Sequence, residues 1–248
     1  FSHVFGQELT ALAGEDGRVC AITAAMQEGT GLTEFARKYP DRLFDVGIAE
    51  GHAVSMAGGM AKQGLVPVFA VYSSFLQRGY DQLLQDVALD GLHVVLGVDR
   101  AGLVGADGET HHGCFDALYL SQVPHMTVLC PASFAELRQM LRRAVLELTG
   151  PVAVRYPRGG EGAYQDCCGN ETFTQVRPGA DCTILTYGVL INEALAAAEL
   201  LHEAGVETRV VKLNAIAPLD GNAVLAALGS EKRLLVLEDC VGLSLIHI

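Results

Sequence analysis

The stretch VPVFAVY, at Val66–Tyr72, begins a pattern that decides the fold class. An amphipathic helical repeat over Phe75–Leu89 follows it, and then the run HVVLGV at His93–Val98. Both outer runs are short, apolar and rich in β-branched residues, as in strands buried on both faces. The order strand, helix, strand is typical of a parallel sheet, so this unit predicts an α/β fold.

The same alternation extends in both directions along the chain. We expect further strands at Val19–Ala24, Leu43–Val46, Met126–Cys130 and Val152–Arg155. Ser133 and Glu136 form a capping box that begins a helix over Phe134–Leu148. The sequence therefore predicts a parallel sheet with helices on both faces within residues 1–163.

A change in composition marks a second part of the chain. Residues 164–178 are polar and show no periodicity, so we expect a linker there. Residues 179–248 carry a second strand–helix series, with strands expected at Cys182–Thr186, Glu207–Lys212 and Arg233–Glu238 and helices at Ile191–Ala204 and after Pro218. Three strands are few for a separate domain, so we expect a truncated one. Residues Ser244–Ile248 follow no earlier pattern, so we expect them to be foreign to this domain.

Composition argues against several classes of function. The 248 residues include 29 Asp and Glu against 17 Lys and Arg, which disfavours a nucleic acid or an anionic membrane as partner. No apolar run approaches the ~20 residues of a membrane span. The seven cysteines form no CxxC pair and no signal peptide is visible, so we expect free thiols in a cytoplasmic setting. Cys167 and Cys168 are interpreted as an ordinary loop pair rather than a redox centre.

Polar and aromatic residues follow several of the expected strands at their carboxyl ends, where open parallel sheets bind ligands. These residues are Glu50, His52, Tyr72, Phe75, Arg78, Asp99, Arg100, Asp107, His111, His112, Arg155 and Arg158. We expect them to gather at one edge of the sheet.

The most informative segment is the loop DRAGLVGADGETHHG, at Asp99–Gly113. Unstructured loops of about this length in compact domains are usually functional or disordered, and its apolar residues argue against disorder. Asp107, His111 and His112 are acceptable zinc ligands, but adjacent residues of an extended chain point to opposite sides. No Walker phosphate loop occurs. We therefore expect no metal site in this chain.

Spacing alone leaves ordinary structural roles open. Glu50 begins an apolar helix, where a carboxylate also interacts favourably with the helix dipole. Phe75 has the helical spacing of a core residue. Any single arginine here could form a surface ion pair.

Four motifs occur together in the first part of the chain: FDVGIAEGH at Phe44–His52, YSSFLQRGYDQLLQDV from Tyr72, the loop Asp99–Gly113 and VRYPRGG from Val154. Together they resemble the 1-deoxy-D-xylulose-5-phosphate synthase family of transketolase-like thiamine-diphosphate enzymes. The resemblance spans residues 1–160 and weakens toward Val241. It implies a pyrimidine-binding domain over residues 1–163 and a partial transketolase C-terminal domain over residues 179–248.

The resemblance implies a reaction and roles for the matching residues. The family joins pyruvate to D-glyceraldehyde 3-phosphate with loss of carbon dioxide, giving 1-deoxy-D-xylulose 5-phosphate for isoprenoid and thiamine synthesis. Glu50 matches the residue that bonds the aminopyrimidine nitrogen of thiamine diphosphate, and Phe75 matches the aromatic that stacks on that ring. The positions that match the family's phosphate and substrate contacts are Tyr72, Arg78, Arg100, Asp107, His111 and Arg158, of which Asp107 and His111 are expected to handle protons or hold hydroxyls.

The chain also departs from the family pattern. Gly51 stands where Gln is usual, and LNAIAPLD at Leu213–Asp220 stands where RFxKPLD is commoner. The GDG…N motif that holds Mg²⁺ and the diphosphate does not occur in this sequence. Because this motif is missing, the resemblance implies that the chain is inactive alone. It also implies that the complete enzyme is a homodimer.

Three other interpretations stay open. A separate C-terminal transketolase subunit, or the beta subunit of a 2-oxo acid dehydrogenase, would share the Glu at the start of a helix but not the GADGETHHG loop. A non-catalytic module could keep the same fold. The presence of Glu50, Arg100 and Arg158 argues against that third interpretation.

Overall fold

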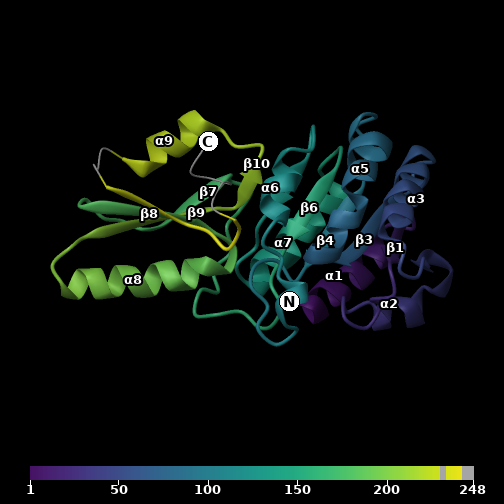
Figure 1. The fold of residues 1–248 in the computed structure, drawn as a ribbon, viewed down its shortest axis with the longest axis horizontal. Coiled ribbons are helices and arrows are strands. Elements are labelled where there is room, and N and C mark those ends of the chain that lie inside the picture. The colour runs from purple at the N-terminus through teal and green to yellow at the C-terminus, as the bar shows by residue number, and fades with distance from the viewer. Residues whose placement is uncertain (230–232, 242–248) are drawn as a thin grey trace.

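The computed structural model of the protein describes residues 1–229 and 233–241. Two α/β lobes lie side by side, the N-terminal one to the right and the C-terminal one to the left in Figure 1. The segment 244–248, expected to be foreign to the domain, lies outside the described residues.

A seven-stranded sheet forms the centre of the N-terminal lobe, in the order β10-β5-β6-β4-β3-β1-β2. Its strands are β1 (Val19–Thr23), β2 (Leu43–Asp45), β3 (Val66–Tyr72), β4 (Val95–Asp99), β5 (Thr127–Leu129), β6 (Val152–Arg155) and β10 (Ala215–Ala217). The first six are parallel. Each lies within one or two residues of a predicted strand, so the predicted parallel sheet is confirmed.

Helices cover both faces of this sheet, as predicted. One face packs against α1 (Ser2–Glu15), α2 (Thr33–Lys38) and α7 (Phe134–Leu146), and the other against α3 (Glu50–Lys62) and α6 (Asp116–Ser121). Ser133 caps α7, because its hydroxyl accepts a hydrogen bond from the Glu136 amide at 3.1 Å. The sheet is therefore buried on both sides, which explains its continuous apolar strands.

The expected helix over Phe75–Leu89 is helical but irregular. It consists of α4 (Ser73–Leu76), a 3-10 turn (Gln77–Gly79), α5 (Tyr80–Gln82) and a π-helical turn (Leu83–Ala88). Apolar spacing predicts which face is buried, but it does not distinguish these closely related hydrogen-bond patterns.

The C-terminal lobe contains a four-stranded sheet in the order β11-β8-β9-β7. Its strands are β7 (Phe173–Arg177), β8 (Cys182–Tyr187), β9 (Thr208–Leu213) and β11 (Leu234–Leu237), and helices α8 (Ile191–Glu203) and α9 (Gly221–Leu228) lie on opposite faces (Figure 1). The three predicted strands and both helices are confirmed.

Two strands were not predicted. The interpretation of residues 164–178 as lacking periodic structure was wrong for β7, which pairs antiparallel with β9 at the sheet edge and is only half buried. Strand β10, within Leu213–Asp220, pairs antiparallel with β5 of the other lobe. Both are short strands defined by distant partners, so local sequence gives little signal for them. The strand β10 also joins the two lobes through one sheet.

A buried ion pair holds the lobes together as well. The Lys212 ammonium of β9 lies 2.9 Å from Glu136 Oε1 of α7, and neither side chain is exposed. The Tyr164 hydroxyl donates to the same carboxylate at 2.9 Å, and the Ala132 amide donates to it at 2.8 Å. No helix among the described residues is long and apolar enough to cross a membrane.

Candidate active site

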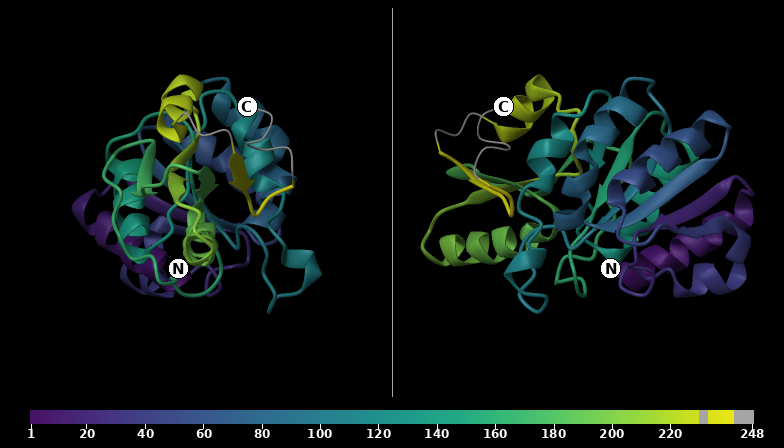
Figure 2. Two further views of the ribbon diagram at one scale, coloured as in Figure 1. Left: turned by 90° about the vertical axis from the view of Figure 1, so that its left-hand side faces the viewer. Right: turned by 45° about the vertical axis from the view of Figure 1, so that its right-hand side comes forward.

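The loop over residues 99–113, called the histidine loop below, leaves the carboxyl end of β4 and returns to α6. It stands out from the body of the molecule, in teal in Figure 2. At its base, Gly102 and Gly113 exchange backbone hydrogen bonds of 3.0 and 2.7 Å. A 3-10 turn at Glu109–His111 is its only regular element among the described residues. The loop is therefore fixed at its base and has little internal structure.

Glu50 lies at the first turn of α3, as predicted, and its side chain is only 3% exposed. Its Oε1 accepts a hydrogen bond of 2.5 Å from Arg78, whose guanidinium also lies 4.8 Å from the centre of the Phe75 ring. These three side chains, with Met26, Ile48 and their neighbours, line a cavity of about 200 Å³. The cavity combines one buried carboxylate with an aromatic ring and apolar walls.

Gly51, where the family usually has Gln, does not prevent α3 from starting at Glu50. A Cβ atom at this position would lie 3.1 Å from Gln82 Oε1 and 3.5 Å from the Arg78 carbonyl oxygen. The start of α3 therefore lies close to the segment that carries Arg78, and a side chain at position 51 would have little room there.

His111 reaches back from the histidine loop to two aromatic residues. Its ring centre lies 5.2 Å from that of Phe75 and 6.0 Å from that of Tyr72, and the latter two rings are 5.6 Å apart. His112 points elsewhere, since its Nδ1 accepts a hydrogen bond of 2.9 Å from the Val104 amide. The side chains of the two neighbouring histidines therefore contact different parts of the molecule.

Asp107, from the same loop, lies between two arginines. Its Oδ2 is 3.3 Å from Arg100 Nε and 3.0 Å from Arg158 Nε. The side chain of Arg100 is 10% exposed, whereas that of Arg158 is 42% exposed. The cluster therefore contains a fixed guanidinium and a more accessible one facing the same carboxylate.

Arg100 is held on every side. It lies 3.0 Å from Asp99 Oδ2, donates to the Gly29 carbonyl at 2.7 Å, and its guanidinium is 4.0 Å from the centre of the Tyr72 ring. Its backbone φ of 59° is left-handed, which is uncommon for a residue other than glycine. Burial raises the pKa of Asp99, and the charge of Arg100 acts against that effect. An arginine that is largely buried and held by several contacts is suited to an anion contact of fixed geometry.

Eight of the residues expected at this edge are brought together in one continuous series of contacts, whereas the exposed His52 is not part of it. In order they are Glu50, Arg78, Phe75, His111, Tyr72, Arg100, Asp107 and Arg158. Arg78 lies at the Glu50 end, apart from the other two arginines of the expected phosphate group. The contributions of Met26, Ile48 and the Gly29 carbonyl were not predicted, although Ile48 lies within a quoted motif and is 81% exposed.

Arg155, the last residue of β6, does not join this series. Its side chain is buried between Asp116, at 2.9 Å, and Asp239 of the C-terminal lobe, at 2.8 Å. Among the described residues, no three or more His, Cys, Asp or Glu side chains are grouped so that they could hold a metal ion.

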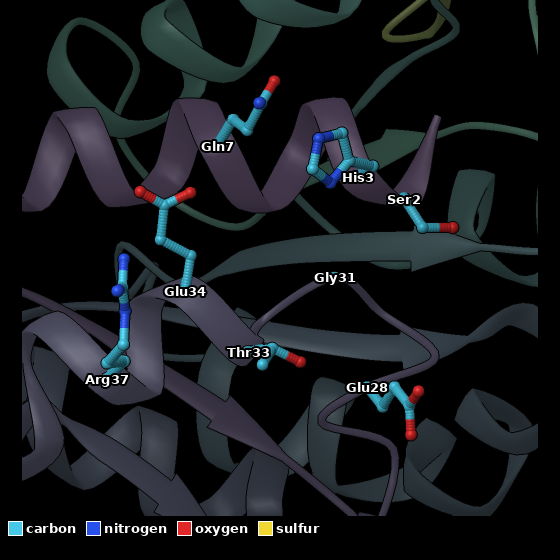
Figure 3. A pocket seen from close by; sticks show the side chains of 8 residues that line it. All are labelled: Ser2, His3, Gln7, Glu28, Gly31, Thr33, Glu34 and Arg37. Atoms are coloured by element: carbon cyan, nitrogen blue, oxygen red, sulfur yellow. The ribbon is translucent and has the colours of Figure 1, made fainter.

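A larger cavity of about 610 Å³ opens between α1, α2 and the segment that precedes α2 (Figure 3). It is lined by Ser2, His3, Gln7, Glu28, Gly31, Thr33, Glu34 and Arg37. None of these belongs to the predicted set. The Ser2 hydroxyl accepts a hydrogen bond of 3.3 Å from Arg100, so this cavity adjoins the arginine cluster.

Residues 1–160 match the family described as the transketolase pyrimidine-binding domain, and residues 172–243 match the transketolase C-terminal domain. The chain belongs to the transketolase family. The 1-deoxy-D-xylulose-5-phosphate synthases of Clostridium kluyveri and Halalkalibacterium halodurans are 47% and 46% identical to it, each over 96% of this chain and 39% of the relative. The chain thus spans about two fifths of the length of these curated relatives, and the resemblance inferred from its motifs is confirmed.

Solved structures of transketolases share the fold. A chain described as a split gene transketolase, in an inactive beta4 tetramer, superposes with a TM-score of 0.83 at 26% identity, over 95% of this chain and 78% of that one. A Pichia stipitis transketolase mutant superposes with a TM-score of 0.82 at 16% identity, over 95% of this chain and 38% of that one. The predicted fold class, a pyrimidine-binding domain followed by a transketolase C-terminal domain, is confirmed.

Proposed function

We propose that this chain provides the pyrimidine-binding half of an enzyme that joins pyruvate to D-glyceraldehyde 3-phosphate, with loss of carbon dioxide, to give 1-deoxy-D-xylulose 5-phosphate. The observation that carries the proposal is the unbroken series of contacts from Glu50 to Arg158. It connects a carboxylate beside an aromatic pocket to a pair of arginines. The names of the curated relatives support the choice of reaction.

The small cavity fits the aminopyrimidine ring of thiamine diphosphate. The ring is flat and apolar on its faces but polar at its edge, and the cavity offers the Phe75 ring, the apolar side chain of Ile48 and the buried carboxylate of Glu50. Thiamine diphosphate, when bound, supplies the electron sink for the loss of carbon dioxide from pyruvate.

Glu50 acts in this proposal as the group that holds a proton at the edge of the pyrimidine. A carboxyl group suits this role because it can both donate and accept a proton. Arg78 forms an ion pair with Glu50 in the structure, and the Arg78 side chain is 54% exposed, so solvent can reach it. We expect Arg78 to leave the carboxylate when a ligand enters the cavity.

Arg100 and Arg158 would bind the phosphate of D-glyceraldehyde 3-phosphate. Guanidinium groups engage phosphate oxygens through paired hydrogen bonds. In the structure both contact Asp107, and an entering phosphate would compete with that carboxylate for them. His111, beside Tyr72 and Phe75, would then lie between the cofactor end and the phosphate end of the site, where it can hold a hydroxyl or move a proton.

The remaining parts of the proposal concern the complete enzyme. Residues that bind the diphosphate and Mg²⁺ would come from outside the 248 residues, in keeping with the greater length of the relatives. We propose that the chain alone is inactive, and that the complete protein is a cytoplasmic homodimer.

A chimera tests the function. This chain replaces the matching segment of the Clostridium kluyveri relative, and carbon dioxide release is measured with both substrates and thiamine diphosphate present. We expect release that requires D-glyceraldehyde 3-phosphate, and no turnover by the 248-residue chain alone. Glu50→Gln in the chimera should lower the rate by about 10²–10⁴-fold, the usual contribution of acid–base catalysis.

Glu203→Gln is the matched control, because Glu203 is an exposed acid on α8 that lines neither cavity of the site, and its loss should leave the rate unchanged. Full activity of the Glu50→Gln chimera would remove the role assigned to that residue. Ketol transfer between sugar phosphates, without use of pyruvate, would instead support the alternative of a transketolase subunit.

A further inference from the structure

The histidine loop has its base packed against the last described residues of the C-terminal lobe. The Asp239 carboxylate occupies the space beside Gly102, since a Cβ atom at Gly102 would lie 2.4 Å from Asp239 Oδ2 and 2.9 Å from its Cγ. Gly102 also has a φ of 77°, a conformation that favours glycine. Only a residue without a side chain fits between the loop and this carboxylate.

The next two residues contact the other limb of the loop. The Val241 amide and the Cys240 thiol both donate to the carbonyl oxygen of Cys114, at 2.9 and 2.7 Å. Cys114 directly follows Gly113, the partner of Gly102 at the loop base. The segment Asp239–Val241 therefore contacts both limbs where they converge.

Arg155 fixes Asp239 in this position. Its Nη2 and Nη1 donate to the two oxygens of Asp239 at 2.8 and 3.3 Å, and its Nε donates to Asp116 at 2.9 Å. Asp116 begins α6, the helix that follows the loop. The ring of Tyr187, from the C-terminal lobe, lies 5.3 Å from the guanidinium. Arg155 thus connects strand β6, helix α6 and the C-terminal lobe at one buried point.

We propose that Asp239 is a positioning residue, through which the C-terminal lobe sets the place of Asp107 and His111 in the histidine loop. The loop has little regular structure of its own, so its placement depends on its base, on the ion pairs of Asp107 and on the ring contacts of His111. A shift at the base would therefore change the positions of both side chains. The expected effect on substrate binding rests on the proposed function, but the expected effect of Asp239 on the position of the loop does not.

Asp239→Asn is a mild way to test this role. The amide keeps the size of the carboxylate and one oxygen for Arg155, and Arg155 remains charge-balanced by Asp116. The substitution weakens the paired contact without leaving a buried charge alone. Glu199→Gln, which removes an exposed acid of α8 paired with Arg177, is the matched control.

Hydrogen–deuterium exchange in the 248-residue chain provides the readout. We expect D239N to speed exchange of the amides between Gly102 and Gly113 about tenfold, with no change in β8 or β9, because one charge-assisted hydrogen bond at the loop base is weakened. D239E, which lengthens the side chain against Gly102, should speed exchange of the same amides. Unchanged loop exchange in both variants would overturn the proposal. Equal acceleration throughout the C-terminal lobe would also overturn it, since Asp239 would then serve stability alone.

A second measurement joins the loop to the reaction. In the chimera described above, D239N should lower kcat/KM for D-glyceraldehyde 3-phosphate about tenfold, because Asp107 and His111 are misplaced before substrate binds. An unchanged kcat/KM would contradict this part. The exchange experiment needs no turnover, so failure of the positioning role and failure of the proposed function can be told apart.

Discussion

Replacing Lys212 by Met should destabilise the protein strongly, because the ammonium belongs to a fully buried ion pair between the lobes. Glu136 would keep the Tyr164 hydroxyl and the Ala132 amide as donors but would lose its only opposite charge among the described contacts. Removing one partner of a buried pair typically costs about 3–5 kcal/mol. The two remaining donors and the apolar Met side chain place the expected loss of unfolding free energy near the lower end, at about 3 kcal/mol.

A double-mutant cycle of Lys212 and Glu136 measures the coupling energy of the ion pair. Glu136→Gln alone should cost about 3 kcal/mol, because it leaves Lys212 buried beside the Asn214 amide oxygen. The combination of Lys212→Met with Glu136→Gln leaves no buried charge at this point. Its loss should equal that of one single substitution rather than their sum, which corresponds to a coupling energy of about 3 kcal/mol.

Urea denaturation followed by circular dichroism measures these differences through the midpoint and slope of unfolding. Lys62→Met is the matched control, because Lys62 pairs with Asp90 on the surface and its loss should leave the midpoint unchanged. Additive losses in the double variant, or a Lys212→Met variant as stable as the wild-type chain, would refute the account of the buried pair.

Other predictions concern the site and the thiols. Phe75→Leu should raise the KM of the chimera for thiamine diphosphate about tenfold, through loss of a stacking contact, and an unchanged KM would count against that contact. Arg158→Ala should raise the KM for D-glyceraldehyde 3-phosphate by about 10- to 100-fold, whereas KM should stay constant if this arginine only pairs with Asp107. Burial raises the pKa of Cys130 and Cys168 to about 12, so about one thiol in 10⁴ is ionised at pH 8. A disulfide reagent should therefore leave both thiols unlabelled in the native chain at pH 8, and their labelling should rise toward alkaline pH. The exposed Cys167 should react first, and equal labelling rates for Cys167 and Cys168 would show that the burial is lost in solution.

Much of the candidate site could be predicted from the sequence, because its residues lie in short continuous motifs. Phe44–His52 and the histidine loop are continuous motifs, and the rule that ligands bind at the carboxyl ends of parallel strands predicted that their side chains would meet. The rule did not distinguish Arg155 from Arg158. The two are three residues apart, yet one is buried between carboxylates and the other is accessible beside Asp107.

The amino-acid sequence by itself determined the alternating strands and helices, the apolar faces that bury them and the residues available for chemistry, because these follow from spacing along one chain. Tertiary structure decided the rest. The edge strand β10 pairs with β5 of the other lobe, Lys212 is buried against Glu136, and Gly102 lies against Asp239, more than one hundred residues away. Each is a contact between segments that are far apart in the chain. The energy of such a contact depends on proximity in space, so the contact produces no periodic pattern in the sequence.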